Sequence, residues 1–240
     1  MLYIIGIGLN DEKDISIKGL EAVKGSDFVY LETYTSRLNC KIEDLEKLYK
    51  KKIILADRNL IEKDADKILE QAKTKDVALL IIGDVFSATT HADLYLRARE
   101  KKIEINIIHN ASVVSAIGIT GLSVYNFGKI TTIPLENKDI TSPIEVFKKN
   151  QKNNLHTLFL LDIKPNKLMT AAEGADYLIK NKISKETMAV ACAALGSEKQ
   201  YLKYDTLENI SKAKVNKFPQ CMIIPGKMHF MEEDMLNLYR

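Results

Sequence analysis

The sequence is poor in residues that bind metals or cross-link chains. Its three cysteines, Cys40, Cys192 and Cys221, lie far apart and form no C-x-x-C pair, so they support neither a zinc site nor a disulfide framework. The four histidines show no spacing typical of metal ligands either. We therefore expect no metal centre, and we expect each histidine to be a hydrogen-bonded structural residue.

Long apolar runs are also missing. No run approaches the roughly 18 residues that a membrane span requires, and residues 1–5 lack the positive flank and cleavage site of a signal peptide. The net charge of +3 is too small to indicate a nucleic-acid partner by itself. These absences predict a soluble, cytoplasmic protein that binds neither a membrane nor nucleic acid directly.

Apolar runs alternate with amphipathic segments in the first part of the chain. Runs of apolar residues predict strands, and apolar residues recurring every three or four positions predict helices. This alternation is typical of a compact parallel-sheet domain, which we assign to residues 1–108. The predicted strands are 2–9, 27–31, 53–55, 79–82 and 105–108, and the helices are 16–24, 42–52, 59–74 and 90–101.

The second part of the chain predicts another α/β domain, residues 109–240, with a mixed sheet. The 240 residues are enough for two small domains. No linker is rich in glycine or serine, so we expect the two domains to be tightly joined. The predicted strands are 130–135, 156–162, 188–193, 201–204 and 221–224, and the helices are 114–122, 143–152 and 170–181.

The stretch 79–91 is the most informative part of the sequence. A two-sidedly apolar run, as in a central parallel strand, ends in Gly83 and Asp84 and leads through a polar turn into a helix. Open α/β sheets bind ligands at the carboxyl ends of such strands. Gly83 allows a ligand to approach the backbone, and Asp84 can accept hydrogen bonds. The alternative is a strand-to-helix turn in which Asp84 only caps the helix.

Six predicted strand ends carry small or polar residues, and they come from both halves of the chain. If the two sheets face each other, these turns line one interdomain cleft, where small-molecule sites are common. They offer few nucleophiles, and no Ser-His-Asp set, Walker loop or carboxylate pair is apparent. Such a site suits group transfer from a cofactor that carries its own activated group. The strand ends are 8–9, 83–84, 110–113, 161–162, 195–196 and 226–229.

Several motifs together resemble the diphthine synthase family, which is related to the tetrapyrrole methylases. They occur in the same order as in that family and cover essentially the whole chain, which is far more specific than any single motif. The matching segments are 3–9, 18–22, 32–36, Asp84 with 88–91, 109–112, 118–122 with 125–128, 155–158 with 161–164, 195–197 and 225–229.

This resemblance implies a class III methyltransferase that uses S-adenosylmethionine, releases S-adenosylhomocysteine and needs no metal. It further implies two α/β domains with the cofactor between them, and a homodimer. The implied substrate is elongation factor 2, whose modified histidine carries a 3-amino-3-carboxypropyl group that is methylated repeatedly on its amine. No catalytic residue can be carried over. The implied cofactor contacts are Leu9, Asp84, Ser87, Ser112, Val113, Leu161, Leu195 and His229.

Two alternatives remain at this stage. One is a methyltransferase of the same fold that acts on tetrapyrroles or ribosomal RNA. Those relatives tend to carry Gly-Pro-Gly-Asp just after the first strand, whereas this chain has Leu9-Asn10-Asp11-Glu12 there. The other is a non-catalytic nucleotide-binding module. The chain also departs from the diphthine synthase pattern at Val85, usually proline, and at Ala194, where a basic residue is common.

Overall fold

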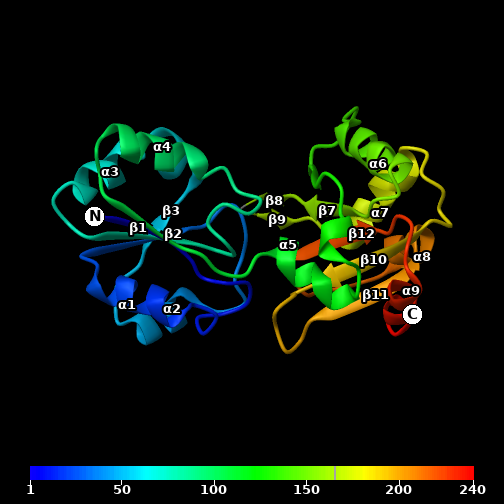
Figure 1. Cartoon of the computed structure of the whole chain (residues 1–240), viewed down its shortest axis with the longest axis horizontal. Helices are drawn as coiled ribbons and strands as arrows, with labels where there is room; N and C mark the ends of the chain where they lie inside the picture. Colours follow the sequence, from blue (N-terminus) through cyan, green and yellow to red (C-terminus); the bar gives the residue numbers. More distant parts are fainter. Residues whose placement is uncertain (165) are drawn as a thin grey trace. The chain divides into compact units, whose positions relative to one another are not determined.

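The computed structural model describes residues 1–164 and 166–240, and the chain divides into two compact units (Figure 1). Unit 1 comprises Met1–Val114 and unit 2 comprises Ser115–Arg240. Each unit contains one five-stranded sheet covered by helices. Among the described residues, no helix is long and apolar enough to cross a membrane.

The sheet of unit 1 is entirely parallel, with strand order β3-β2-β4-β1-β5. Its centre is β4, in which every residue is buried, as expected for a strand covered on both faces. This confirms the predicted parallel α/β class. The strands are β1 (Leu2–Gly6), β2 (Phe28–Glu32), β3 (Ile54–Ala56), β4 (Val77–Ile81) and β5 (Ile105–Ile108).

Helices cover the two faces of this sheet in pairs (Figure 1). Residues of α1 and α2 share one apolar cluster with Ile5 and Leu80, and residues of α3 and α4 share another with Ile4 and Leu79. The chain therefore leaves the neighbouring strands β1 and β4 toward opposite faces, and ligands of open α/β sheets bind at such a switch point. The helices are α1 (Ile17–Gly25), α2 (Ile42–Tyr49), α3 (Asp66–Ala72) and α4 (Ala92–Glu100).

Two predicted helices are interrupted in the structure. The segment 59–74 forms a π-helical turn, η1 (Asn59–Lys63), followed by α3, and the predicted helix 114–122 becomes α5 (Val113–Ala116) and a 3-10 turn, η2 (Ile117–Thr120). In the first case Ile61, Ile68 and Leu69 are all buried. The apolar spacing that predicted one helix is therefore preserved across the break between η1 and α3. Periodicity alone could not reveal that break.

The sheet of unit 2 is mixed, with strand order β11-β10-β12-β7-β6. Only β6 and β7 run parallel among its described pairs, and the remaining pairs are antiparallel. The main strands are β6 (Thr131–Ile133), β7 (Thr157–Leu161), β10 (Met188–Ala193), β11 (Tyr201–Thr206) and β12 (Gln220–Ile224), with a small antiparallel pair, β8 (Ile163–Lys164) and β9 (Lys167–Leu168).

One apolar cluster packs three helices of unit 2 against this sheet. Residues of α6, α7 and α8 share it with Phe159, Ala191 and Met222. The short helices α8 and α9 and the 3-10 turn η3 were not predicted. The helices and this turn are η3 (Val124–Asn126), α6 (Ser142–Lys152), α7 (Ala171–Lys180), α8 (Leu207–Lys212) and α9 (Phe230–Asn237).

A buried carboxylate holds α9 in place. Glu232 is 3% exposed, and it accepts hydrogen bonds from the backbone amides of Ser123 and His229, both at 2.8 Å. Its Oε1 also lies 3.3 Å from Nε2 of His156, whose Nδ1 accepts a hydrogen bond from the Gly226 amide at 2.9 Å. Glu232 therefore joins three segments that are far apart in the sequence.

The charge state of Glu232 follows from these contacts. Burial alone would raise the pKa of its carboxyl, but the amides of Ser123 and His229 outweigh burial and lower the pKa to about 2. In the unfolded chain the pKa of a glutamate carboxyl is about 4.3. The ionised carboxylate of Glu232 therefore stabilises the fold above that pH. The stabilisation is lost as the pH falls toward 2.

We predict that Glu232→Gln lowers the free energy of unfolding by about 2 kcal/mol at pH 7, since an amide cannot accept every hydrogen bond of the carboxylate. The difference from wild type should shrink as the pH falls from about 5 to 2. Urea unfolding followed by circular dichroism measures both effects. Glu233→Gln, at the neighbouring exposed residue, is the control and should change stability little. Equal losses in the two variants would contradict the assigned role.

Candidate functional site

The carboxyl ends of β1 and β4 are joined by a pair of glycines. Gly8 and Gly83 hydrogen-bond each other in both directions, with N–O distances of 3.3 and 2.7 Å. Both have positive φ, 83° and 87°, a conformation that favours glycine. A Cβ at Gly8 would also lie 2.3 Å from Cβ of Asp14. The tight turn after β1 and its contact with β4 therefore require these glycines.

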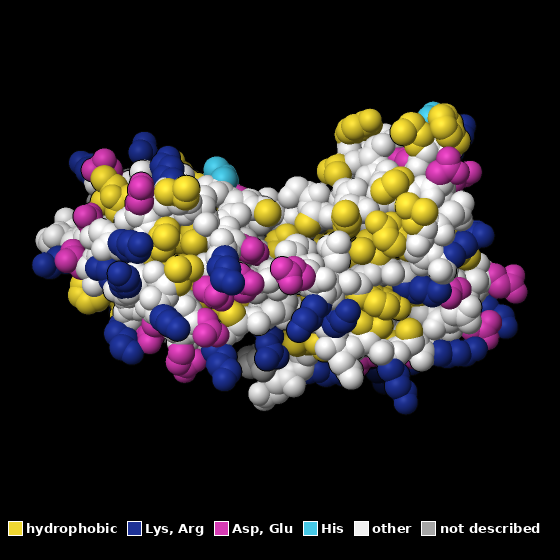
Figure 2. All heavy atoms as spheres, turned by 90° about the horizontal axis from the view of Figure 1, so that it is seen from below, with side chains coloured by type: hydrophobic (Ala, Val, Ile, Leu, Met, Phe, Trp, Pro, Cys, Tyr) yellow, Lys and Arg dark blue, Asp and Glu magenta, His cyan; other side chains and the backbone are white. Residues whose placement is uncertain are grey.

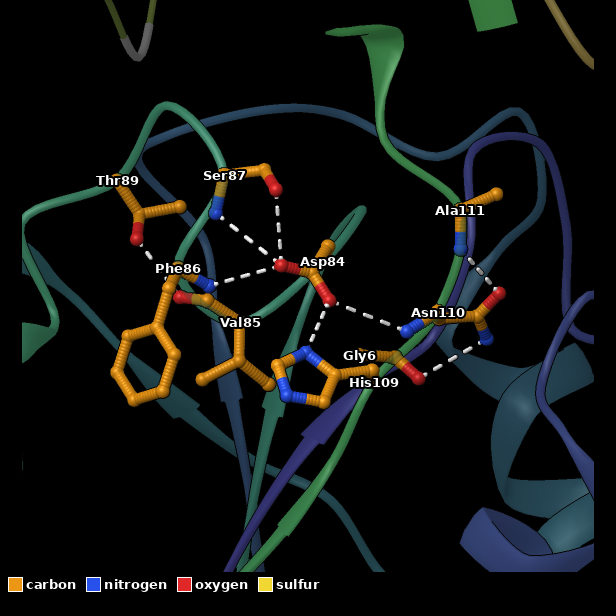
Figure 3. Close-up of polar contacts among 9 residues, drawn as sticks. All are labelled: Gly6, Asp84, Val85, Phe86, Ser87, Thr89, His109, Asn110 and Ala111. Carbon is orange, nitrogen blue, oxygen red and sulfur yellow. Dashed lines mark hydrogen bonds and ion pairs between the residues drawn. The ribbon is translucent and has the colours of Figure 1, made fainter. Parts of the chain in front are cut away.

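Asp84 connects the loops that follow β4 and β5 (Figure 3). Its Oδ1 accepts hydrogen bonds from the amides of Phe86 (3.1 Å) and Ser87 (3.2 Å) and from the Ser87 hydroxyl (2.9 Å). Its Oδ2 accepts from the Asn110 amide (3.2 Å) and lies 2.8 Å from Nδ1 of His109. Asp84 does not cap α4, because that helix begins at Ala92 and its N-cap residue, His91, makes no side-chain capping hydrogen bond. The described hydrogen bonds of Asp84 instead fix the turn after β4 and the loop after β5.

These contacts keep Asp84 ionised. Burial acts to raise the pKa of its carboxyl, but hydrogen bonds from His109, Phe86, Ser87 and Asn110 together lower it to about 2. The carboxylate is thus negatively charged at neutral pH. It fixes two loops and places one negative charge at the carboxyl edge of the sheet.

Asn110 fastens the same edge to Gly6 at the end of β1 (Figure 3) and to the loop that follows β1. Its side-chain amide donates to the carbonyls of Gly6 and Asp14, both at 3.0 Å, while its Oδ1 accepts from the Ala111 amide at 2.7 Å. Asp14 in turn accepts from the Leu9 amide at 3.0 Å. Through Asp84, Asn110 and Asp14, the loops after β1, β4 and β5 form one connected rim.

The structure brings five of the predicted site residues to this rim. Leu9 follows the Gly8 turn, Ser87 is bonded to Asp84, and Ser112 and Val113 follow Asn110. Ser112 is buried, and its hydroxyl accepts from the Val114 amide at 3.1 Å. The sequence analysis did not predict the structural roles of Asp14 and Asn110, because they depend on contacts between residues far apart in the sequence.

The predicted residues of unit 2 do not all lie together. Leu161 ends β7, and Leu195 follows β10. The register pairs Leu160 with Cys221, and Ala193 with Gln220, so these two strand ends share one edge of the sheet.

His229 lies beyond the opposite end of β12. Its exposed side chain caps α9, with Nδ1 accepting from the Met231 amide at 3.4 Å. The structure therefore separates His229 from Leu161 and Leu195 within unit 2.

The rim of unit 1 leaves room beside its backbone. An added Cβ at Gly83 would meet only the Ala111 carbonyl oxygen, at 3.8 Å, within 4 Å. The loops of the rim also carry backbone groups, the hydroxyls of Ser87 and Ser112 and the carboxylate of Asp84. These are groups that hold a polar, positively charged small molecule, and they fit a sulfonium cofactor. Among the described residues, no group of three or more histidine, cysteine or acidic side chains could hold a metal ion.

We predict that Asp84→Ala loosens the rim without unfolding unit 1. Hydrogen exchange should accelerate at the amides of Phe86, Ser87 and Asn110, because each loses its carboxylate acceptor. In the wild type, the same amides should lose protection as the pH falls from about 4 toward 2, after correction for intrinsic exchange. Asp57→Ala is the matched control, since Asp57 caps only an exposed turn through the Leu60 amide. Unchanged protection at all three amides would contradict the prediction.

Comparison with known proteins identifies the family. Residues 1–211 match the model of the tetrapyrrole (corrin/porphyrin) methylases. The chain is 43% identical over 249 residues to a diphthine synthase of Methanococcus maripaludis, covering 99% of this chain and 98% of that protein. It is 40% identical over 271 residues to a diphthine methyl ester synthase of Bos taurus, covering 100% and 95%.

A solved structure gives the same result. The crystal structure of a diphthine synthase superposes with a TM-score of 0.94 at 39% identity, covering 99% of this chain and 95% of that one. Similarity of sequence and fold thus extends over both units. The chain belongs to the tetrapyrrole methylase family and, within it, to the diphthine synthases.

Proposed function

We propose that this protein is a diphthine synthase. It transfers methyl groups from S-adenosylmethionine to the amine of the 3-amino-3-carboxypropyl group on the modified histidine of elongation factor 2, in the cytoplasm. The observation that supports this proposal most strongly is full-length identity of about 40% to proteins of that name. The loop rim at the carboxyl edge of β1, β4 and β5 agrees with it.

The cofactor contacts proposed in unit 1 are backbone and hydroxyl groups of Leu9, Ser87, Ser112 and Val113. Asp84 contributes by holding their loops and by placing a negative charge near the sulfonium. Leu161, Leu195 and His229 are the contacts proposed in unit 2. When bound, the cofactor supplies a methyl group that is already activated by its sulfonium.

The work of this chain is then chiefly alignment. Hydrogen bonds within the chain fix the loops of the rim, so little order has to be gained on binding. Holding acceptor and methyl donor in line can lower a barrier by up to roughly 7–11 kcal/mol. Gly83 is buried but has no side chain, so a ligand at the rim could approach its backbone closely.

The names of the relatives indicate two different methylated products. The archaeal relative is called a diphthine synthase and the bovine relative a diphthine methyl ester synthase, which adds a carboxylate ester to the possible products. Both reactions use the same cofactor and protein substrate. Mass spectrometry of the modified peptide distinguishes them, because an ester methyl is removed by mild alkali and an amine methyl is retained.

We predict that the wild-type chain methylates elongation factor 2 that carries the unmethylated intermediate, when supplied with labelled S-adenosylmethionine. Calorimetry should show cofactor binding, and Asp84→Ala should weaken it about tenfold, or about 1.4 kcal/mol, because the rim loses its anchor. Asp57→Ala should bind like wild type. Methylation of a tetrapyrrole or of ribosomal RNA instead would support the alternative function, and cofactor binding without any transfer would support a binding module.

We further propose that the protein is a homodimer in which α9 contacts a second copy of the chain. Phe230 and Met231 of this helix are 64% and 62% exposed, and Leu238, directly after it, is 73% exposed. Tyr125 is 88% exposed and lies two residues after Ser123, whose amide binds Glu232 of the helix. Figure 2 shows charges of both signs interspersed over one face, with apolar side chains exposed between them. Apolar patches of this kind favour association, and a two-fold axis would bury the same patch on both copies.

We predict that Phe230→Glu shifts the protein from dimer to monomer, since a charge would be buried at the contact. Light scattering after size exclusion measures the mass directly. Lys148→Glu, at an exposed position of α6, should leave the mass unchanged. A wild-type monomer, or a Phe230→Glu dimer of wild-type stability, would exclude this interface.

A further inference from the structure

We propose that His109 is the general base that removes the proton from the acceptor amine, with Asp84 as its positioning residue. This inference rests on the proposed methyl transfer to an amine and deepens it. It concerns a residue that the sequence analysis treated as structural. The argument uses the geometry of one histidine and one carboxylate within unit 1.

The tautomer of His109 follows from its partner. Nδ1 lies 2.8 Å from Oδ2 of Asp84, which accepts hydrogen bonds from other groups and is ionised at neutral pH. An ionised carboxylate has no proton to donate, so Nδ1 must carry the shared proton. In a neutral imidazole the second nitrogen, Nε2, then has a free lone pair and can accept a proton.

The ring is also accessible. The side chain of His109 is 66% exposed, whereas that of Asp84 is 9% exposed. Figure 3 shows the ring presenting Nδ1 to Asp84, with its second nitrogen on the other side. Asp84 is the charged group that contacts the His109 ring. The neutral ring of Phe86 packs edge-on against the same ring, with 6.3 Å between the two ring centroids. A buried carboxylate thus orients an exposed imidazole, the arrangement by which enzymes position a basic histidine.

The other histidines lack this combination. His156 is fully buried and uses both ring nitrogens, and His91 is 1% exposed. His229 is exposed, but its Nδ1 accepts a hydrogen bond from a backbone amide. His109 alone among the four joins an exposed ring to a carboxylate partner on Nδ1 in the described part of the chain.

The reaction needs such a base because an alkyl amine is mostly protonated at neutral pH. Nε2 of His109 takes one proton from the ammonium, which frees the nitrogen lone pair. That pair forms the new N–C bond to the methyl carbon while the C–S bond breaks, and both electrons of the broken bond stay on sulfur. The methylated nitrogen again carries a proton, which must be removed before the next transfer. The exposed imidazolium returns its proton to solvent.

The test compares His109→Gln with wild type on elongation factor 2 that carries the unmethylated intermediate. We expect kcat to fall about a hundredfold at pH 7, while the calorimetric affinity for the cofactor stays within twofold. The deficit should shrink as the pH rises, because the amine then loses its proton to solvent. Glu104→Gln, an exposed residue before the amino end of β5, is the matched control and should keep wild-type rates.

A second measurement does not depend on turnover. The chain has four histidines, so His109→Gln identifies the His109 signals in the nitrogen-15 spectrum by their disappearance. We expect the wild-type ring to be protonated on Nδ1 at pH 8, and Asp84→Asn to reduce that preference. A ring protonated on Nε2, or a His109→Gln variant with wild-type kcat and pH profile, overturns the proposal. A wild-type chain that transfers no methyl overturns the proposed function as well.

Discussion

The rim of unit 1 depends on one ionised carboxylate. Asp84 follows the most deeply buried strand of the sheet and accepts hydrogen bonds from both neighbouring loops. A carboxylate is well suited to this position, because its two oxygens offer about four lone pairs and carry the charge that strengthens each bond. Neutral acceptors would hold fewer amides and hold them less tightly. The loop geometry is therefore set by the protein itself.

Unit 2 uses the same device for a different purpose. Glu232 gathers amides from two segments and a histidine ring, and both carboxylates are held ionised by hydrogen bonds in spite of burial. Asp84 lies beside the exposed ring of His109 and directly follows Gly83, so we propose that the loop order it imposes serves chemistry. Glu232 is a buried residue of α9, a short helix whose outer side chains are exposed, so it fixes an exposed surface in place.

The sequence predicted the parallel sheet well, because strands such as β4 are apolar throughout and are followed by amphipathic helices. It also placed Leu9, Asp84, Ser87, Ser112 and Val113 on the end of that sheet. It could not locate breaks that preserve the apolar spacing, as in 59–74. Helix α9 buries a single apolar residue, Leu236, and α8 buries only Leu207 and Ile210, which is too few for a periodic apolar signal.

The details of the site were less predictable because they depend on pairs distant in sequence. Asn110 bonds to Gly6 and Asp14, and no local pattern indicates such partners. The motif at 225–229 predicts a ligand contact at His229, and this stays a prediction. Within unit 2 its side chain caps α9, and it follows the end of β12 that lies away from Leu161 and Leu195. In an antiparallel sheet the carboxyl end of a strand can lie at either end of the sheet, and the direction of that strand decides which.

The pair of glycines at Gly8 and Gly83 limits how this enzyme can diverge. Each has a left-handed backbone, and the two are bonded to each other, so a bulkier residue at one disturbs the turn that holds the other. A side chain at Gly8 would also collide with Asp14. New specificities in descendants of this chain must therefore arise by changing the side chains around the ligand, while these two positions stay without any.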